Sequence, residues 1–324
     1  MEYSFAVMPS TEISDSSRHD LQRHTKLINN IYLFGHDEFI PSFITNAWNI
    51  LDQMPTEHTA REINIIFQNI IKNLMPNDTT AIDYFNFEIP SIHEGKNGWD
   101  VINFQYRFPV EFRFFFYDET SNVYMTIFRY LLKLYKAKAS SLNFISSKLS
   151  NRQAPEEFEM LITNLHTIFT VLIGYLRSVF DSQYALLELS MQNARGYGDM
   201  QKAHFSFLHN IVSLSFLPIN YNTNHTGPEC YFILELLDYY DNFVLKLKWD
   251  FSNDLDSSRA VMKICCDRFN KIKNLAIATM QSVKSNGFNS KYLRILILSF
   301  EFQIWNNAPD EIANLDKFFE NLQI

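Results

Sequence analysis

Few residues of this 324-residue chain have the types and the spacing that catalysis or metal binding requires. His204 and His209 are five positions apart, whereas two metal ligands on one helical face are typically four apart. Cys265 and Cys266 are adjacent, so a helix would point their side chains about 100° apart. We interpret the histidines as ordinary surface or packing residues and the cysteines as packing residues, with a redox pair as the alternative.

The acidic residues Glu235, Asp238 and Asp241 share one predicted helix and could do acid–base work. A solvated acidic face is the simpler interpretation. The chain has only 8 glycines and no Walker A, G-x-G-x-x-G or G-x-S-x-G pattern, which disfavours a phosphate-binding loop or a hydrolase elbow. These observations predict a protein that is not an enzyme and that holds no cofactor or metal.

Composition and charge restrict the class further. Hydrophobic residues make up 47% of the chain and charged residues 20%, as expected of a folded globular protein. The formal net charge of −8 argues against a general nucleic-acid binder. Three cysteines cannot form a disulfide framework, and the sequence shows neither a signal peptide nor a long uncharged apolar stretch. We expect a cytosolic chain with no membrane span.

Apolar residues recur every three or four positions along most of the chain, which predicts helices. The predicted helices cover residues 20–34, 37–52, 59–75, a segment after 118, a long helix that includes 158–187, and 199–217, 229–249, 255–285, 289–305 and 309–322. Residues 1–18 are polar and Ser-rich and are expected to form a flexible tail. Residues 19–324 are expected to form one helical domain.

Two segments interrupt the helical pattern. Residues 76–98 are predicted to be a polar connection, and residues 101–116 are rich in aromatic and β-branched residues, which predicts two short strands around Pro109. The aromatic run 112–117 is interpreted as a buried strand, with a protein-binding edge strand as the alternative. The predicted fold is therefore all-α, an elongated helical bundle with one small inserted β-strand pair.

A row of basic residues on the helix after residue 118 is the other feature that could recognise a partner. The residues are Arg129, Lys133, Lys136, Lys138 and Lys148. They could attract phosphate or an acidic protein, or they could form an ordinary solvated helix face. The residues by themselves thus predict an all-α interaction module, and their chemistry does not name the partner.

Four segments in the same order resemble the C-terminal half of the gamma-tubulin complex proteins. They cover residues 33–39, 98–132, 179–184 and 195–217. The first is similar to the family's L-x-G-x-G-[DE]-[LF] junction. Gly35, Glu38 and Phe39 fit this pattern, whereas His36 and Asp37 stand where the family often has Arg or Gln and then Gly.

The other segments add matches in order. Tyr106 and Arg107 fit the family's Y-[KR]-V-x-W-P-L strand pair, although a Val-Glu dipeptide stands in place of its Trp-Pro. Residues 179–184 are similar to V-[LI]-[ED]-S-Q-[FWY], and residues 203–208 to A-H-x-x-[FY]-L. Over about residues 20–305 the spacings most resemble the fourth-component type of the family.

The resemblance implies a fold and a role. Members of the family pair an N-terminal helical domain, used for lateral packing, with a C-terminal helical domain that binds gamma-tubulin. This chain resembles only the second half, so we expect a fragment, a short isoform or a reduced paralogue that lacks the lateral domain. The implied function is non-enzymatic binding of gamma-tubulin, with other complex components, in microtubule nucleation at minus ends and at organising centres such as the centrosome or spindle pole. An unrelated all-α scaffold or adaptor is the alternative.

Three surfaces are the expected contacts with gamma-tubulin: the junction at residues 35–39, the strand segment at 106–116 and the basic face at 129–138. The candidate contact residues are Gly35, His36, Asp37, Glu38, Phe39, Tyr106, Arg107, Arg113, Arg129, Lys133 and Lys136. Packing within the bundle is the alternative for each of them.

Overall fold

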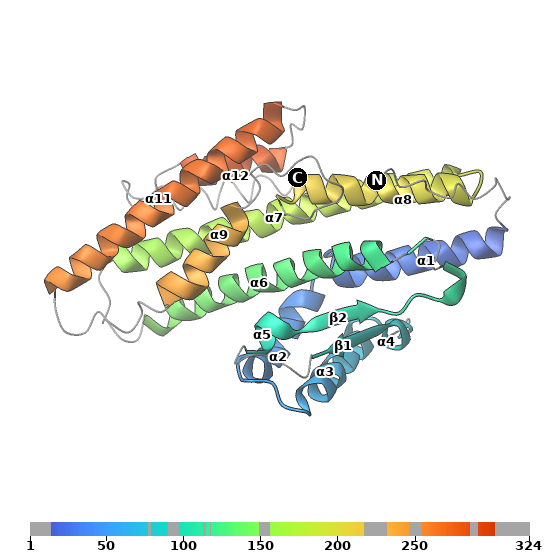
Figure 1. Ribbon diagram of the computed structural model, residues 1–324, viewed down its shortest axis with the longest axis horizontal. Coiled ribbons are helices and arrows are strands. Elements are labelled where there is room, and N and C mark those ends of the chain that lie inside the picture. Colours follow the sequence, from blue (N-terminus) through green and yellow to red (C-terminus); the bar gives the residue numbers. More distant parts are fainter. Residues whose placement is uncertain are drawn as a thin grey trace. The chain divides into compact units, whose positions relative to one another are not determined.

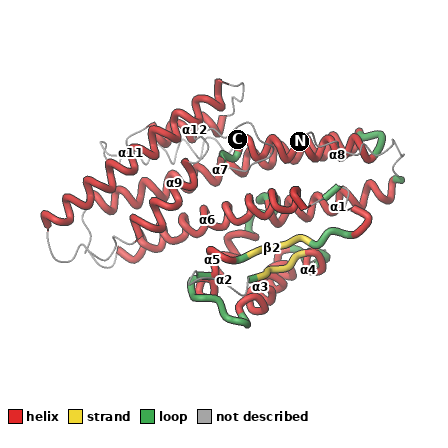
Figure 2. The backbone as a smooth tube through the Cα atoms, in the orientation of Figure 1, coloured by secondary structure: helices red, strands yellow, loops and turns green. Residues whose placement is uncertain are grey.

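The computed structural model of the chain describes residues 14–76, 79–89, 97–112, 115–116, 118–148, 156–216, 232–245, 255–285 and 291–301. The elements in chain order are α1 (Asp15–Tyr32), α2 (Phe39–Leu51), α3 (Thr59–Leu74), α4 (Ala81–Tyr84), β1 (Phe85–Glu88), α5 (Gly98–Val101), β2 (Asn103–Tyr106), the 3₁₀ turn η1 (Val110–Phe112), α6 (Asp118–Lys148), α7 (Glu156–Asn193), α8 (Tyr197–Leu214), α9 (Phe232–Asp238), the π-helical turn η3 (Tyr239–Val244), α11 (Leu255–Ser285) and α12 (Lys291–Glu301). Figures 1 and 2 show that helices dominate the described residues and that β1 and β2 lie side by side. The predicted all-α fold with one small β-strand pair is confirmed.

The chain divides into two compact units. Unit 1 comprises residues 1–137 and 173–233, and unit 2 comprises residues 138–172 and 234–324. The long helices α6 and α7 each contribute residues to both units.

An aromatic core around the two-stranded antiparallel sheet organises part of unit 1. The register pairs Phe85 with Tyr106 and Phe87 with Phe104. The rings of Phe87 and Phe104 stack with their centroids 3.9 Å apart, and the Phe128 ring of α6 lies 4.8 Å from that of Phe104. Because buried aromatic rings contribute large apolar areas, these contacts fix the sheet against α6.

The position of one strand differs from the prediction. β2 lies within the expected segment 101–116, but its partner β1 comes from residues 76–98, which we predicted to be a connection. The residues after Pro109 form η1 instead of a second strand. In β1 two buried phenylalanines alternate with half-buried Asn86 and Glu88, so the period of two is present but extends over only four residues.

The first two helices begin at residues other than those expected. α1 begins earlier, because the Ser14 hydroxyl accepts a hydrogen bond from the Ser17 backbone N–H and caps the helix. Residues 15–18, which we assigned to the tail, are therefore helical. α2 begins at Phe39, two residues after the start that the sequence predicted.

The long helices agree with the prediction. α7 has 38 residues, and α11 has the predicted bounds. By length and composition the segment Phe158–Asn193 could cross a membrane, but more than half of its most apolar window is buried within the fold, so it is weak evidence for a span. The helix predicted over residues 309–322 lies outside the described residues.

In unit 2 the predicted helix over residues 229–249 is divided into α9 and η3. The Tyr239 hydroxyl donates a hydrogen bond to the Cys265 carbonyl at 3.0 Å. The rings of Phe169 and Tyr240 meet edge to face with centroids 5.2 Å apart. These contacts join η3 to α11 and to the α7 residues of this unit.

Candidate protein-interaction surfaces

The junction between α1 and α2, residues 35–39, depends on a close backbone approach at Gly35. Phe34 has a φ of 66°, and the backbone N–H of Gly35 donates to the Asn29 carbonyl at 3.0 Å. A Cβ atom on Gly35 would lie 2.4 Å from Nδ2 of Asn29 and 2.8 Å from Oδ1 of Asn30. A residue with a Cβ atom at this position would therefore require the Asn29 and Asn30 side chains at the end of α1 to move.

The side chains of this junction differ in how accessible they are. Phe39 is fully buried and packs in the core. The accessible residues are Gly35, His36, Asp37 and Glu38. The Asp37 carboxylate forms an ion pair with the Arg177 guanidinium of α7, so it ties the junction to that helix.

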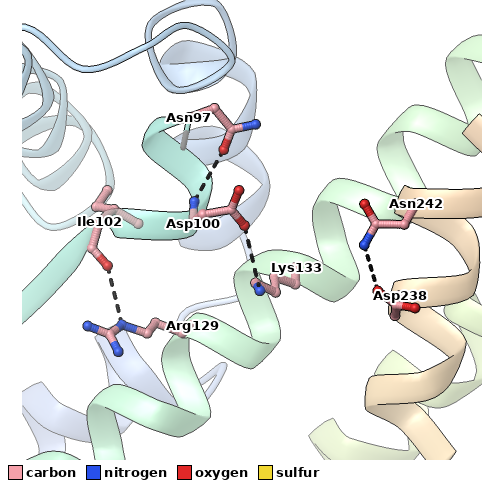
Figure 3. A network of polar contacts seen from close by, with 7 residues as sticks. All are labelled: Asn97, Asp100, Ile102, Arg129, Lys133, Asp238 and Asn242. Carbon is pink, nitrogen blue, oxygen red and sulfur yellow. Dashed lines mark hydrogen bonds and ion pairs between the residues drawn. The ribbon is translucent and has the colours of Figure 1, made fainter. Parts of the chain in front are cut away.

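Three basic side chains of α6 that we expected to face a partner contact the chain itself. The α6 cation row consists of Arg129, Lys133 and Lys136. Arg129 donates through Nε to the Ile102 carbonyl at 3.3 Å and through Nη2 to Oδ1 of Asn103 at 3.1 Å, and Figure 3 shows the first of these contacts. Burial of the guanidinium lowers the pKa of Arg129. Lys133 Nζ lies 3.8 Å from a carboxylate oxygen of Asp100 (Figure 3).

Lys136 completes this row by contacting an indole ring. Its Nζ lies 5.7 Å from the ring centroid of Trp99, within cation–π range. The Trp99 ring in turn meets the Trp48 ring of α2 edge to face at 5.6 Å. Gly98 lies directly against α2, because a Cβ there would be 2.9 Å from Cα of Leu51. The segment that begins at residue 98 is thus held between α2 and α6.

At each edge of the sheet, a helix side chain bonds to outward backbone groups of one residue. On the β1 edge the Asn64 amide donates to the Phe87 carbonyl at 2.8 Å and accepts from the Phe87 N–H at 2.9 Å. On the β2 edge the Tyr32 hydroxyl donates to the Phe104 carbonyl at 2.8 Å. An added strand would need these backbone groups. Asn64 could not be identified from the sequence, because an asparagine in an amphipathic helix carries no local signal of such a role.

The aromatic run over residues 112–117 contains no strand among its described residues. Phe112 ends η1, and Phe112, Phe115 and Phe116 are buried. The prediction of burial is confirmed for these three, whereas the prediction of a strand is wrong. Arg113 lies outside the described residues.

β2 is followed by a short ordered turn, the tip, defined as residues 107–110. The backbone N–H of Arg107 donates to the carbonyl of the residue before β1 at 2.6 Å, and the Phe108 ring stacks on Phe116 at 4.5 Å. The Arg107 side chain is exposed, and Val110 is 71% exposed. Val110 was not among the predicted contact residues, and the signal that could have indicated it is the Val-Glu dipeptide in place of the family's Trp-Pro.

Tyr106 lies behind the tip and is buried. Its hydroxyl hydrogen-bonds to Nδ1 of His24 in α1, and burial raises the pKa of the phenol. The structure therefore places Tyr106 as a support for the turn, and its role in partner binding stays a prediction.

The residues first considered for catalysis lie in packing or surface positions. His204 is buried, its Nε2 lies 2.7 Å from the Tyr124 hydroxyl, and burial lowers its pKa to about 3. His209 on the same helix is exposed. Cys265 is buried and unpaired, and burial raises the pKa of its thiol to about 11, which keeps it protonated and inert. The packing interpretations of His204 and Cys265 are confirmed.

The acidic residues of α9 and η3 have local partners. Asp238 accepts hydrogen bonds from Arg268 at 3.3 Å and from Nδ2 of Asn242 at 2.6 Å, the latter shown in Figure 3. Glu235 is exposed. Across the part of the chain that the structure describes, no group of three or more His, Cys, Asp or Glu residues is placed to hold a metal ion.

Comparison with known proteins gives a consistent result. Residues 21–305 match the family described as "Gamma tubulin complex component C-terminal". Gamma-tubulin complex component 4 of Mus musculus is 22% identical over 306 residues, which cover 86% of this chain and 45% of that protein, and the Homo sapiens protein gives the same values. The Arabidopsis thaliana protein of the same name is 19% identical over 348 residues, which cover 90% of this chain and 44% of its own length. The chain thus spans less than half the length of the curated relatives it matches.

Proposed function

This chain belongs to the gamma tubulin complex component C-terminal family, and we propose that it binds gamma-tubulin as part of a gamma-tubulin complex. The observation that carries the proposal is the match over residues 21–305. In this role the chain contributes to microtubule nucleation at minus ends, together with other complex components. Its place of action is the cytoskeleton at a microtubule organising centre, such as the centrosome or spindle pole.

The proposed mechanism requires no catalysis. A helical framework holds loops and the turn after β2 in fixed positions, and nucleation follows from the spacing of several gamma-tubulin molecules. The binding free energy would come from a few buried apolar or aromatic anchors surrounded by a polar rim. A guanine nucleotide, where one takes part, would belong to gamma-tubulin and not to this chain.

The proposed contacts follow from which candidate residues are accessible. We assign direct contacts to the accessible residues of the junction and the tip, which are Gly35, His36, Asp37, Glu38 and Arg107. Phe39 and Tyr106 are buried and would support these contacts from beneath. Arg113 is proposed on sequence grounds alone.

Co-purification tests the proposal. The chain is expressed with gamma-tubulin and the product is analysed by size-exclusion chromatography with mass determination. We expect a stoichiometric 1:1 complex, and no complex with the αβ-tubulin heterodimer in the control. A chain that elutes folded and alone in the presence of gamma-tubulin would refute the proposal and favour a scaffold or adaptor role that does not involve gamma-tubulin.

A further inference from the structure

We infer that residues 99–110 form a rigid docking element, whose base is held on α6 by the α6 cation row and whose tip contacts an acidic surface of a partner protein. The inference rests on the proposed function, because gamma-tubulin is the partner used to test it. It adds which residues make the contact, which residues only position them, and what chemistry the partner must present.

The base is held by three different contacts from one face of α6. Arg129, Lys133 and Lys136 are spaced by four and three residues, which places them on the same side of a helix. Arg129 contacts one backbone and one side-chain oxygen, Lys133 contacts a carboxylate, and Lys136 contacts an indole ring. All four of these groups lie within residues 99–103. Arg129 stays exposed and Lys133 and Lys136 stay partly exposed, so these contacts leave the cations accessible from solvent. Because all three cations contact the same short segment, we assign to the row the role of positioning the element.

Hydrogen bonds at both edges of the sheet disfavour binding by strand addition. The outward N–H and C=O of Phe87 are both bonded to the Asn64 amide, and the Phe104 carbonyl is bonded to Tyr32. A partner strand would have to break these hydrogen bonds before it could pair with β1 or with β2 at Phe104. These hydrogen bonds favour contact through exposed side chains over strand addition.

The tip presents such side chains in a fixed arrangement. The sheet holds the backbone of Arg107, the ring stack on Phe116 holds Phe108, and the Phe112 N–H donates to the Pro109 carbonyl at 3.0 Å. Little conformational entropy is then lost when the tip is covered, which favours binding. Val110, at 71% exposed, offers an apolar contact beside the Arg107 guanidinium at the other end of the same turn.

The charge at the tip indicates an acidic partner. Arg107 forms no ion pair within the part of the chain that the structure describes. The carboxylate of Asp83 in α4 is exposed and does not pair with it there. A complementary surface would carry a carboxylate for the Arg107 guanidinium and an apolar side chain to cover Val110.

Two tip variants with matched controls test the contact. Arg107→Glu reverses the exposed charge, and Val110→Ser removes the apolar contact. Arg61→Glu and Ile65→Ser are the controls, because both residues are exposed on α3 of the same unit. We expect each tip variant to raise the Kd for gamma-tubulin by about tenfold or more and each control to change it less than about twofold, at unchanged thermal unfolding temperatures. Added salt should reduce the difference in Kd between the wild type and Arg107→Glu. It should leave the difference in Kd between the wild type and Val110→Ser unchanged.

A third variant tests the base separately. Arg129→Met removes the hydrogen bonds to Ile102 and Asn103, so amide hydrogen exchange in β2 of the free chain should become about tenfold faster. A residue that only contacted the partner would leave this exchange unchanged. Weaker gamma-tubulin binding with unchanged exchange in β2 would therefore overturn the positioning role.

The outcomes separate the two proposals. If the wild-type chain does not bind gamma-tubulin, the proposed function fails and the inference fails with it. If the wild type binds and Arg107→Glu and Val110→Ser bind equally well, the inference is overturned while the proposed function stands.

Discussion

Acidic solution should destabilise this protein through His204, which the fold buries in its neutral form. The imidazole is only 2% exposed, stacks on Phe115 with centroids 4.5 Å apart and pairs through Nε2 with the Tyr124 hydroxyl at 2.7 Å. Burial disfavours the charged form and lowers the pKa to about 3. In an unfolded chain a histidine has a pKa of about 6.5.

The sign and the size of the effect follow from these two values. Because the folded pKa lies below the unfolded one, the unfolded chain binds a proton between about pH 6.5 and pH 3 that the folded chain does not bind. The free energy of unfolding is therefore unaffected above about pH 6.5 and decreases as the pH falls from there toward about 3. At pH 5 the contribution of His204 is a loss of about 2 kcal/mol.

Urea unfolding at pH 8 and pH 5, at constant ionic strength, measures this loss. His204→Gln keeps an acceptor for the Tyr124 hydroxyl but cannot titrate. Its free energy of unfolding should therefore decrease by about 2 kcal/mol less than that of the wild type between pH 8 and pH 5. His209→Gln is the control, because His209 is exposed on the same helix, and it should follow the wild-type profile. Equal losses for the wild type and His204→Gln would refute the reasoning.

The same histidine links acid stability to the proposed docking element. Its ring lies 5.3 Å from that of Phe116, and Phe116 stacks on Phe108 of the tip at 4.5 Å. Protonation of His204 would place a charge beneath this stack, and no acidic partner for it lies among the residues that the structure describes. The tip should therefore lose its support in the same pH range in which the unit loses stability.

Three further substitutions test the close contacts of unit 1 and of α7. Gly35→Ala should lower the free energy of unfolding by about 1–3 kcal/mol, because the new methyl group would meet Asn29, and an unchanged urea midpoint would contradict this. Gly174→Ala should raise it by about 0.5–1 kcal/mol, because this glycine lies inside α7 with no atom within 4 Å of the added methyl group, and a loss of stability would contradict this. Asn64→Leu should lower it by about 2 kcal/mol or more and speed amide exchange at Phe87, and slow exchange there would show that this edge does not depend on Asn64.

The sequence was sufficient for the long helices because their apolar stripes extend over many turns. α7 and α11 were predicted closely, since a pattern of that length outweighs any single residue. The sequence was insufficient for β1, because four alternating residues give little signal and the pairing that stabilises them lies 15 or more residues further along the chain. Strand formation there depends on β2, on Asn64 and on the phenylalanine stack, none of which is local.

The candidate contact residues also depend on tertiary contacts that the sequence does not show. The spacing of Arg129, Lys133 and Lys136 correctly indicated one helix face, but spacing does not show what lies opposite that face. The structure places residues 99–103 beside that face, where they contact all three cations. Arg129 stays exposed and Lys133 and Lys136 stay partly exposed, so their contact with a partner stays a prediction. Gly98 could be matched to a family motif from the sequence alone. The physical reason for a glycine at this position is a tertiary contact, because a Cβ atom there would lie 2.9 Å from Cα of Leu51.

Positioning by the α6 cation row does not remove its electrostatic effect. Three cations of the row meet one carboxylate, that of Asp100, and their other contacts are with neutral oxygens and a ring, so a charge of 3 − 1 = +2 remains. Lys133 and Asp100 are both partly solvent-exposed, which weakens their mutual attraction. The remaining charge acts over roughly one Debye length, about 8 Å at physiological salt. The row can therefore favour the approach of an acidic partner without touching it, while the tip makes the contact.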